Sequence, residues 1–202
     1  MDPLIEGYRK FRAETWPTER ARYEALAHWG QSPDTMVIAC SDSRVDPQSI
    51  FGAVPGEMFV VRNVAALAPP FQPDGAGYHG TSAALEFGVR VLKVVRLVVL
   101  GHAQCGGVRA MVYGAPPQAS DFVAAWVDIG RPAVARASAD ARGPKLTEVE
   151  IGVVRLSLAN LLTFPWIAER VAAGRLEVSG YLFDIHTGVL SRVTADGVET
   201  VD

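Results

Sequence analysis

The stretch MVIACSDSR, residues 36–44, decides the fold class of this chain because it joins a short apolar segment to a polar turn. A β-branched apolar run of this length between turn signals is typical of a strand buried on both faces. Residues 58–61 (MFVV) and 97–100 (LVVL) repeat the pattern, and helical spacing recurs between the predicted strands. Strands that are separated by helices predict a mostly parallel sheet covered by helices on both faces.

Helices are expected in the segments around these strands. Thr18 has the side chain and position of an N-cap, and Thr147 with Glu150 forms a capping-box signature. Pro165 is expected to kink or interrupt the last helix before it resumes. The predicted helices cover residues 4–15, 18–30, 82–93, 105–113, 120–139, 147–162 and 165–173.

The end of the chain alternates between apolar and polar residues over 176–184 and 189–193, with Thr187-Gly188 between them. This pattern predicts an antiparallel hairpin at the edge of the sheet. The predicted fold class is therefore α/β, with a mostly parallel central sheet, helices on both faces, an antiparallel edge strand and an N-terminal helical arm. A length of 202 residues suits a single domain over residues 1–202, of which residues 1–30 form the arm.

Composition excludes several classes of protein. Hydrophobic residues make up 49% of the chain, which is enough to fill a core and excludes wholesale disorder. The formal net charge of −3 leaves no basic surplus for a nucleic-acid partner. The most apolar stretch, residues 89–100, contains Arg90, Lys93 and Arg96, so we expect no membrane span.

Cys40 and Cys105 are the only cysteines in the sequence. Two cysteines cannot build a disulfide framework, and residues 1–10 lack the apolar core of a signal peptide. We therefore expect free thiols and a reducing, cytoplasmic location.

Both cysteines follow predicted strands. Cys40 ends the first strand, while His102 and Cys105 come just after residues 97–100. Ligands of open parallel sheets collect at the carboxyl ends of strands. Two thiolates and one imidazole are a zinc set that leaves a fourth position open in catalytic sites. A buried, purely apolar role is the alternative for either thiol alone, and a redox disulfide has less support because Cys-x-x-Cys is absent.

Asp42 and Arg44 lie two residues apart in the turn after Cys40. Their side chains can point the same way and form a salt bridge beside the metal. An ordinary surface pair, which contributes about 0–1 kcal/mol, is the alternative. Next to zinc, Asp42 could accept the hydrogen bond of zinc-bound hydroxide and aim its lone pair, or occupy the fourth ligand position, and Arg44 would hold its carboxylate ionised.

The order of these motifs resembles that of the β-class carbonic anhydrases. The resemblance covers about residues 31–113, and four motifs carry it: CSDSRV at 40–45, PGE at 55–57, FVVRNV at 59–64 and GHAQCGG at 101–107.

The resemblance implies a specific chemistry. Cys40, His102 and Cys105 would bind one Zn²⁺ per subunit, and Asp42 with Arg44 would form the catalytic dyad. The implied reaction is CO₂ + H₂O ⇌ HCO₃⁻ + H⁺, carried out by zinc-bound hydroxide that the dyad orients.

The resemblance also implies a substrate pocket. Phe59, Val64 and Phe87 match positions that line the family's apolar pocket, with plain core packing as the alternative. Gln31 matches a residue that reaches across the dimer in plant-type members to bond substrate. The backbone N–H of Gly106 could add a hydrogen-bond donor to a substrate oxygen.

This chain departs from the family in two places. Plant-type members generally carry Tyr where it has Phe87. A second subgroup builds an allosteric bicarbonate site from a Trp, an Arg and a Tyr, which align here with Val37, Arg62 and Phe183. We therefore predict no such regulatory site, and we expect Asp42 to stay off the metal near neutral pH.

The N-terminal arm is unusually aromatic. Such a face must be buried, and the family pattern places it over a partner subunit in a homodimer or tetramer. Its aromatic residues are Tyr8, Phe11, Trp16, Tyr23 and Trp29.

Histidines outside the predicted zinc set have lesser expected roles. His79 lies in a glycine-rich loop and could assist proton transfer, while His28 and His186 are expected to be surface or boundary residues. Two other functions stay open: a zinc hydrolase of CS₂ or COS with the same fold, and a non-catalytic protein in which a closed zinc site stabilises the fold.

Overall fold

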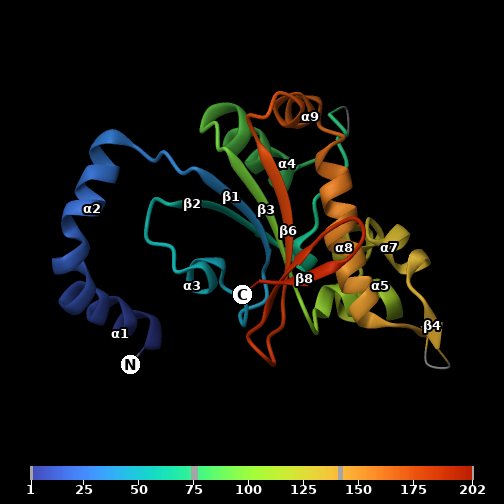
Figure 1. Cartoon of the computed structure of the whole chain (residues 1–202). Coiled ribbons are helices and arrows are strands. Elements are labelled where there is room, and N and C mark those ends of the chain that lie inside the picture. The colour runs from blue at the N-terminus through green and yellow to red at the C-terminus, as the bar shows by residue number, and fades with distance from the viewer. Residues whose placement is uncertain (1, 74–76, 141–142, 202) are drawn as a thin grey trace.

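A six-stranded sheet is the centre of the computed structural model, which describes residues 2–73, 77–140 and 143–201 (Figure 1). Its strands are β1 (Thr35–Cys40), β2 (Met58–Asn63), β3 (Arg96–His102), β6 (Glu177–Phe183), β7 (Leu190–Val193) and β8 (Val198–Thr200). They lie in the order β2-β1-β3-β6-β7-β8, with the first four parallel and the last two antiparallel. The predicted α/β fold with an antiparallel edge is confirmed, although the sequence did not indicate β8.

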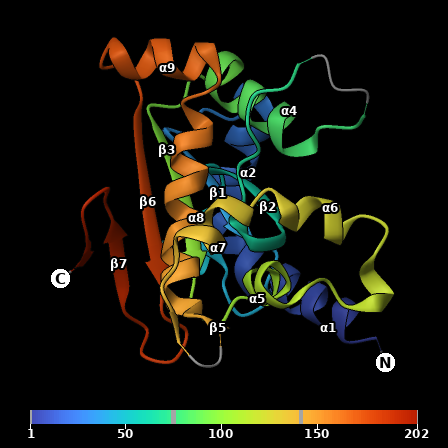
Figure 2. The same cartoon turned by 90° about the vertical axis from the view of Figure 1, so that its right-hand side faces the viewer.

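Helices lie on both faces of this sheet, as predicted (Figures 1 and 2). Figure 2 shows α8 running along the sheet with α5, α6 and α7 beside it. The α-helices are α1 (Pro3–Lys10), α2 (Trp16–Trp29), α3 (Pro47–Phe51), α4 (Gly80–Glu86), α5 (Gly106–Tyr113), α6 (Val123–Asp128), α7 (Arg131–Arg136), α8 (Leu146–Leu161) and α9 (Pro165–Ala172). A small second sheet pairs β4 (Ala139–Asp140) with β5 (Gly143–Pro144).

Alternation along β1 divides the core between the two faces of the sheet. Met36 and Ile38 join a buried cluster with residues of α4, α8 and α9. Val37 and Ala39 point to the other face, where they pack with Ile50 of α3 and its neighbours. Because side chains alternate along a strand, this pattern makes both faces of β1 fully apolar up to Cys40.

The N-terminal helices are more continuous than predicted. A π-helical turn, η1 (Phe11–Thr15), joins α1 to α2, so Trp16-Pro17 does not separate two helices. The wider turn accommodates the ring and missing N–H of Pro17. The prediction of Thr18 as an N-cap is wrong, because its hydroxyl donates to the carbonyl of Thr15 (2.8 Å) inside the helix.

Two helix predictions in the second half need correction. Residues 120–139 form α6 and α7 rather than one helix, because Gly130 packs closely against Met111 of α5 and Pro132 cannot donate a helical hydrogen bond. The capping box is also wrong. Lys145 is the N-cap of α8, and the side chain of Glu150 turns toward Cys105 instead of the helix start.

The arm stands apart from the sheet in Figure 1. None of the residues of α1 or α2 is buried. Phe11, Trp16 and Tyr23 contact one another, with ring centroids 5.3–6.3 Å apart, while Trp29 is 82% exposed. The chain therefore leaves much of this aromatic surface without cover.

No single helix among the described residues is long and apolar enough to cross a membrane. Helices α8 and α9 pass that test only as a pair, and the pair is bent by 90°.

Two glycines let α8 approach the sheet closely. A Cβ at Gly180 of β6 would lie 2.6 Å from Val154 Cγ1 and 2.9 Å from Leu158 Cδ1. A Cβ at Gly101 of β3 would lie 2.6 Å from Val154 Cγ2. Because Val154 fits between β3 and β6, α8 lies over the carboxyl half of β3, which ends at His102.

Gly180→Ala is expected to lower the free energy of unfolding by about 1–3 kcal/mol, because the added methyl group overpacks the α8 contact. Urea denaturation of both proteins measures the change. Gly7→Ala is the matched control, since nothing lies within 4 Å of a Cβ at that exposed position of α1. An unchanged urea midpoint for Gly180→Ala would contradict this account of the packing.

Candidate metal centre and active site

Three side chains with metal-binding atoms meet at the carboxyl end of the sheet. Cys40 ends β1, His102 ends the neighbouring strand β3, and Cys105 is the N-cap of α5. Their ligand atoms all lie within 4.8 Å of one another, and the two Sγ atoms are 3.9 Å apart. All three residues are buried. The structure thus brings together the trio that spacing alone indicated.

A tight turn returns the chain from His102 to Cys105. The N–H of Ala103 donates to the carbonyl of Phe183 at the end of β6 (2.9 Å). Gln104 then adopts a left-handed conformation with φ 57°, which costs an L-residue about 1–2 kcal/mol. This reversal places the Cys105 thiol back over the end of the sheet.

His102 leaves one ring nitrogen available to a cation. Its Nδ1 lies 2.9 Å from the carbonyl oxygen of Ala103, so Nδ1 carries the proton and donates it. Its buried Nε2 has no hydrogen-bond partner among the described residues. An unsatisfied buried acceptor costs about 1–3 kcal/mol, and a cation would remove that cost. Together with two thiols, this nitrogen is a donor set that fits Zn²⁺.

A hydrogen bond between the two thiols shifts their pKa values in opposite directions. The pKa of Cys40 is lowered to about 4 because the thiol of Cys105 donates a hydrogen bond to it, although burial opposes the shift. The same hydrogen bond and burial raise the pKa of Cys105. Burial lowers the pKa of His102, but the nearby Cys40 thiolate and the Ala103 carbonyl favour the charged ring, and the net shift is upward. A metal that binds both sulfurs would displace the Cys105 proton.

Asp42 and Arg44 form a two-pronged ion pair beside this trio. Arg44 donates from Nε to Asp42 Oδ1 (2.9 Å) and from Nη2 to Oδ2 (2.7 Å). The backbone N–H of Arg44 also donates to Oδ1 (3.0 Å). These bonds to Arg44 hold the pKa of the Asp42 carboxyl well below its usual range. Asp42 Oδ2 lies 3.8 Å from His102 Nε2, so the ionised carboxylate faces the metal-binding atoms.

Sequence and structure comparisons agree on one family. Residues 35–190 match the family model described as "Carbonic anhydrase". The chain belongs to the β-class carbonic anhydrases. The predicted enzyme class is thereby confirmed.

Curated relatives support this membership. The chain is 33% identical to "Beta carbonic anhydrase 3" of Arabidopsis thaliana over 93% of its own length and 74% of that protein. It is 35% identical to "Beta carbonic anhydrase 6, mitochondrial" of the same plant over 92% of its length, but it spans only 64% of that relative.

Solved structures share the whole architecture. The β-carbonic anhydrase CcaA superposes with a TM-score of 0.86 at 28% identity, covering 98% of each chain. A structure from a study of two tetrameric β-carbonic anhydrases of Sordaria macrospora gives a TM-score of 0.79 at 25% identity, covering 95% of each chain.

Two of the predicted substrate residues of this carbonic anhydrase lie near its metal-binding trio. A Cβ at Gly107 would lie 2.7 Å from Val64 Cγ1, and Val64 packs against the cluster that holds both cysteines. The indole of Trp126 donates to the carbonyl of Val64 (2.8 Å) and holds this segment in place. Gly106 is the exposed first residue of α5.

The other three predicted substrate residues lie at the opposite end of the sheet. Phe59 pairs with Met36. Met36 lies four residues before Cys40, a distance of about 13 Å along β1. Phe87 lies against Phe59, with ring centroids 5.7 Å apart. Gln31 lies between α2 and β1, before the strands begin. A single chain therefore does not bring Gln31, Phe59 or Phe87 to its own metal-binding trio.

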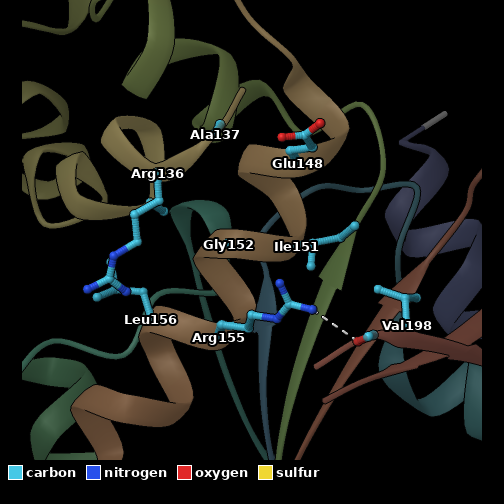
Figure 3. Close-up of a pocket in the computed structure, with 10 residues that line it drawn as sticks. Arg136, Ala137, Glu148, Ile151, Gly152, Arg155, Leu156 and Val198 are labelled. Carbon is cyan, nitrogen blue, oxygen red and sulfur yellow. Dashed lines mark hydrogen bonds between the residues drawn. The ribbon is translucent and has the colours of Figure 1, made fainter. Parts of the chain in front are cut away.

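No sequence pattern indicated a cavity beside α8. This cavity of about 310 Å³ lies between α7, α8 and β8, and Arg136, Glu148 and Arg155 line it (Figure 3). None of the predicted site residues borders it.

Glu150 is a site residue that sequence reasoning missed, because its spacing from Thr147 suggested a helix cap. It is only 4% exposed, and its Oε1 accepts the backbone N–H of Cys105 (3.2 Å). Burial raises the pKa of this carboxyl, although the backbone N–H groups of Cys105 and Gln104 partly offset the shift.

Arg62 supports the loop that carries the ion pair. Its Nε donates to the carbonyl of Cys40 (2.9 Å). Its Nη2 donates to the carbonyls of Asp42 (2.7 Å) and Val45 (2.9 Å). The residue that aligns with part of an allosteric bicarbonate site in other members thus has a structural role here.

Arg62→Ala is expected to lower the free energy of unfolding by about 1–3 kcal/mol, because three backbone carbonyls lose a charged donor. The free energy of unfolding of Arg62→Lys should lie between those of the wild type and Arg62→Ala, since one ammonium group cannot reproduce the planar fork of donors. Urea denaturation measures both changes. Because no allosteric bicarbonate site is predicted here, titration of the wild type with bicarbonate should show no cooperative effect on activity. A fully stable Arg62→Ala protein would contradict the loop-support role.

Proposed function

We propose that this chain catalyses the reversible hydration of CO₂ with one Zn²⁺ per subunit, held by Cys40, His102 and Cys105. One observation carries the proposal: His102 Nε2, without a hydrogen-bond partner in the described part of the chain, lies beside two thiols and 3.8 Å from a carboxylate held by Arg44. When bound, zinc acts as a Lewis acid that makes water nucleophilic near neutral pH.

Asp42 is proposed to orient the nucleophile. Because Arg44 keeps its carboxylate ionised, Asp42 can only accept hydrogen bonds. A water or hydroxide that donates its hydrogen to Asp42 must turn a lone pair away from the carboxylate and toward the carbon of CO₂. Both carboxylate oxygens bond Arg44, which favours the expectation that Asp42 stays off the metal near neutral pH.

Gly106 is proposed to bind a substrate oxygen. It opens α5, and the first N–H groups of a helix have no partner within the helix. Such a donor stabilises the negative charge that develops on the oxygens of CO₂ as bicarbonate forms.

A partner subunit is proposed to complete the pocket. Gln31, Phe59 and Phe87 lie at the opposite end of the sheet from their own chain's trio, so they can serve a pocket only in a neighbouring copy. The uncovered aromatic surface of the arm supports such an assembly. Tetramers occur among the similar Sordaria macrospora enzymes, and we propose a dimer or tetramer here.

The dyad is tested by Arg44→Ala and Asp42→Asn. Each is expected to lower kcat/KM by about 10²-fold, because the nucleophile loses its orientation while the zinc ligands remain. Stopped-flow CO₂ hydration at pH 8 and zinc quantification measure the two effects separately. Arg131→Ala is the matched control, because Arg131 pairs with Asp128 on the surface of the protein.

Three outcomes would contradict parts of this proposal. An Arg44→Ala protein that keeps both zinc and full activity would exclude the dyad. A zinc-loaded wild type with negligible CO₂ hydration but turnover of CS₂ or COS would be a hydrolase instead. A zinc-loaded wild type inactive on all three substrates would indicate a structural zinc site.

Pocket completion by a partner is tested with mixed oligomers. Arg44→Ala chains and Gln31→Ala/Phe87→Ala chains are co-expressed with different affinity tags, and oligomers that carry both tags are purified. Each parent should be impaired by about tenfold or more. In the mixed dimer one site carries both defects and the other carries neither, so about half of the wild-type activity should return. No recovery would place Gln31 and Phe87 outside the partner's pocket.

A further inference from the structure

The peptide unit between Gln104 and Cys105 is held at both of its polar ends. Its carbonyl oxygen, on Gln104, accepts a hydrogen bond from Arg44 Nη2 (3.2 Å). Its N–H, on Cys105, donates to Glu150 Oε1 (3.2 Å). Because a peptide unit is planar, two bonds at opposite edges fix the orientation of the whole plane.

This orientation sets the place of the Cys105 sulfur. The plane fixes the backbone on either side, including the left-handed Gln104 and the extended Cys105 from which the side chain projects. Cys105 caps α5 without any side-chain hydrogen bond of its own, so the helix start depends on an outside acceptor.

Glu150 is rigid enough to serve as that acceptor. It lies in the first half of α8, and its neighbours on the helix, Val149 and Val153, are 0% and 3% exposed. Both valines pack in the same buried cluster as Cys40 and Cys105. The carboxylate is therefore held by the core rather than by a mobile loop.

We propose that Glu150 is a positioning residue of the metal centre. By holding the peptide between Gln104 and Cys105, it directs the Cys105 thiolate toward Cys40 and His102. Through the carbonyl of the same peptide it also positions Arg44, which links the metal ligands to the dyad. This inference rests on the proposed zinc ligands Cys40, His102 and Cys105. The exposed side chain of Gln104 has no role in it.

The zinc Kd, measured by chelator competition, tests this role in the full-length protein. Glu150→Ala is expected to weaken zinc binding by about 10–100-fold, because metal sites lose this much when an outer partner is removed. Glu150→Gln keeps an acceptor oxygen and should recover most of the loss. After reloading with zinc, Glu150→Ala should also show a lower kcat with little change in KM, since Arg44 loses its alignment.

Arg155→Met is the matched control on the same helix. Arg155 donates from Nε to the carbonyl of Thr194 (2.8 Å) and from Nη2 to that of Gly197 (3.1 Å; Figure 3), and neither bond involves a residue of the metal centre. This variant should lower Tm and leave the zinc Kd unchanged. If Arg155→Met and Glu150→Ala weakened zinc binding equally, Glu150 would contribute only to general stability. That result would overturn the proposal.

Two further outcomes overturn it: a Glu150→Ala protein that binds zinc like the wild type, or a Glu150→Gln protein that is as weak as Glu150→Ala. If Glu150→Ala does not fold, the zinc Kd of Gln104→Gly and of Gln104→Val tests the positioned peptide instead. Glycine adopts φ 57° freely and valine resists it, so only valine should weaken zinc binding. Equal affinities for these two variants would exclude the positioned peptide.

The same experiment separates this inference from the proposed function. A wild-type protein that lacks one zinc per chain, or a Cys40→Ser protein that binds zinc as tightly, would overturn the zinc set itself. If the wild type binds one zinc per chain and Glu150→Ala binds zinc equally tightly, only the role of Glu150 would be overturned.

Discussion

The parallel pairing of β1 with β3 is the interaction on which the rest of the site depends. Its register joins Thr35 to Arg96 and Ala39 to Leu100, so Cys40 and His102 both lie at the carboxyl end of the sheet, one residue out of register with each other. A shift of one residue in this pairing would turn every side chain of β1 to the opposite face of the sheet, that of Cys40 included. The apolar residues of β1, buried on both faces of the sheet, specify that register strongly.

Charge is the second constraint, since the carboxyl end of the sheet gathers two thiols, Asp42 and Glu150 in a small volume. The fold balances them in different ways. Arg44 neutralises Asp42 with two side-chain hydrogen bonds, and a backbone N–H satisfies Glu150. The thiols share a hydrogen bond that lowers the pKa of Cys40. A divalent cation would balance the remaining negative charge, which explains why this donor set suits a metal better than a disulfide.

Local pattern was enough to predict the four parallel strands, the antiparallel edge strand β7 and the placement of both cysteines after strands. Prediction failed where the partner of a side chain is distant in sequence. Glu150 is 45 residues from Cys105, and no spacing rule relates them, so the nearby Thr147 suggested a cap instead. Arg62 likewise bonds carbonyls 17–22 residues away. The break between α6 and α7 depends on contact with Met111, which a propensity argument does not include.

Assembly bears on the dyad as well as on the pocket. The side chain of Arg44 is 48% exposed in the single chain, whereas that of Asp42 is 16% exposed. An ion pair this accessible to water is weak and screened by salt. If the amino end of a partner's sheet covers it with Gln31, Phe59 and Phe87, water is excluded and the same hydrogen bonds become stronger. The apolar wall that receives CO₂ would then also hold Asp42 ionised and fixed, so substrate access and nucleophile orientation would depend on one interface.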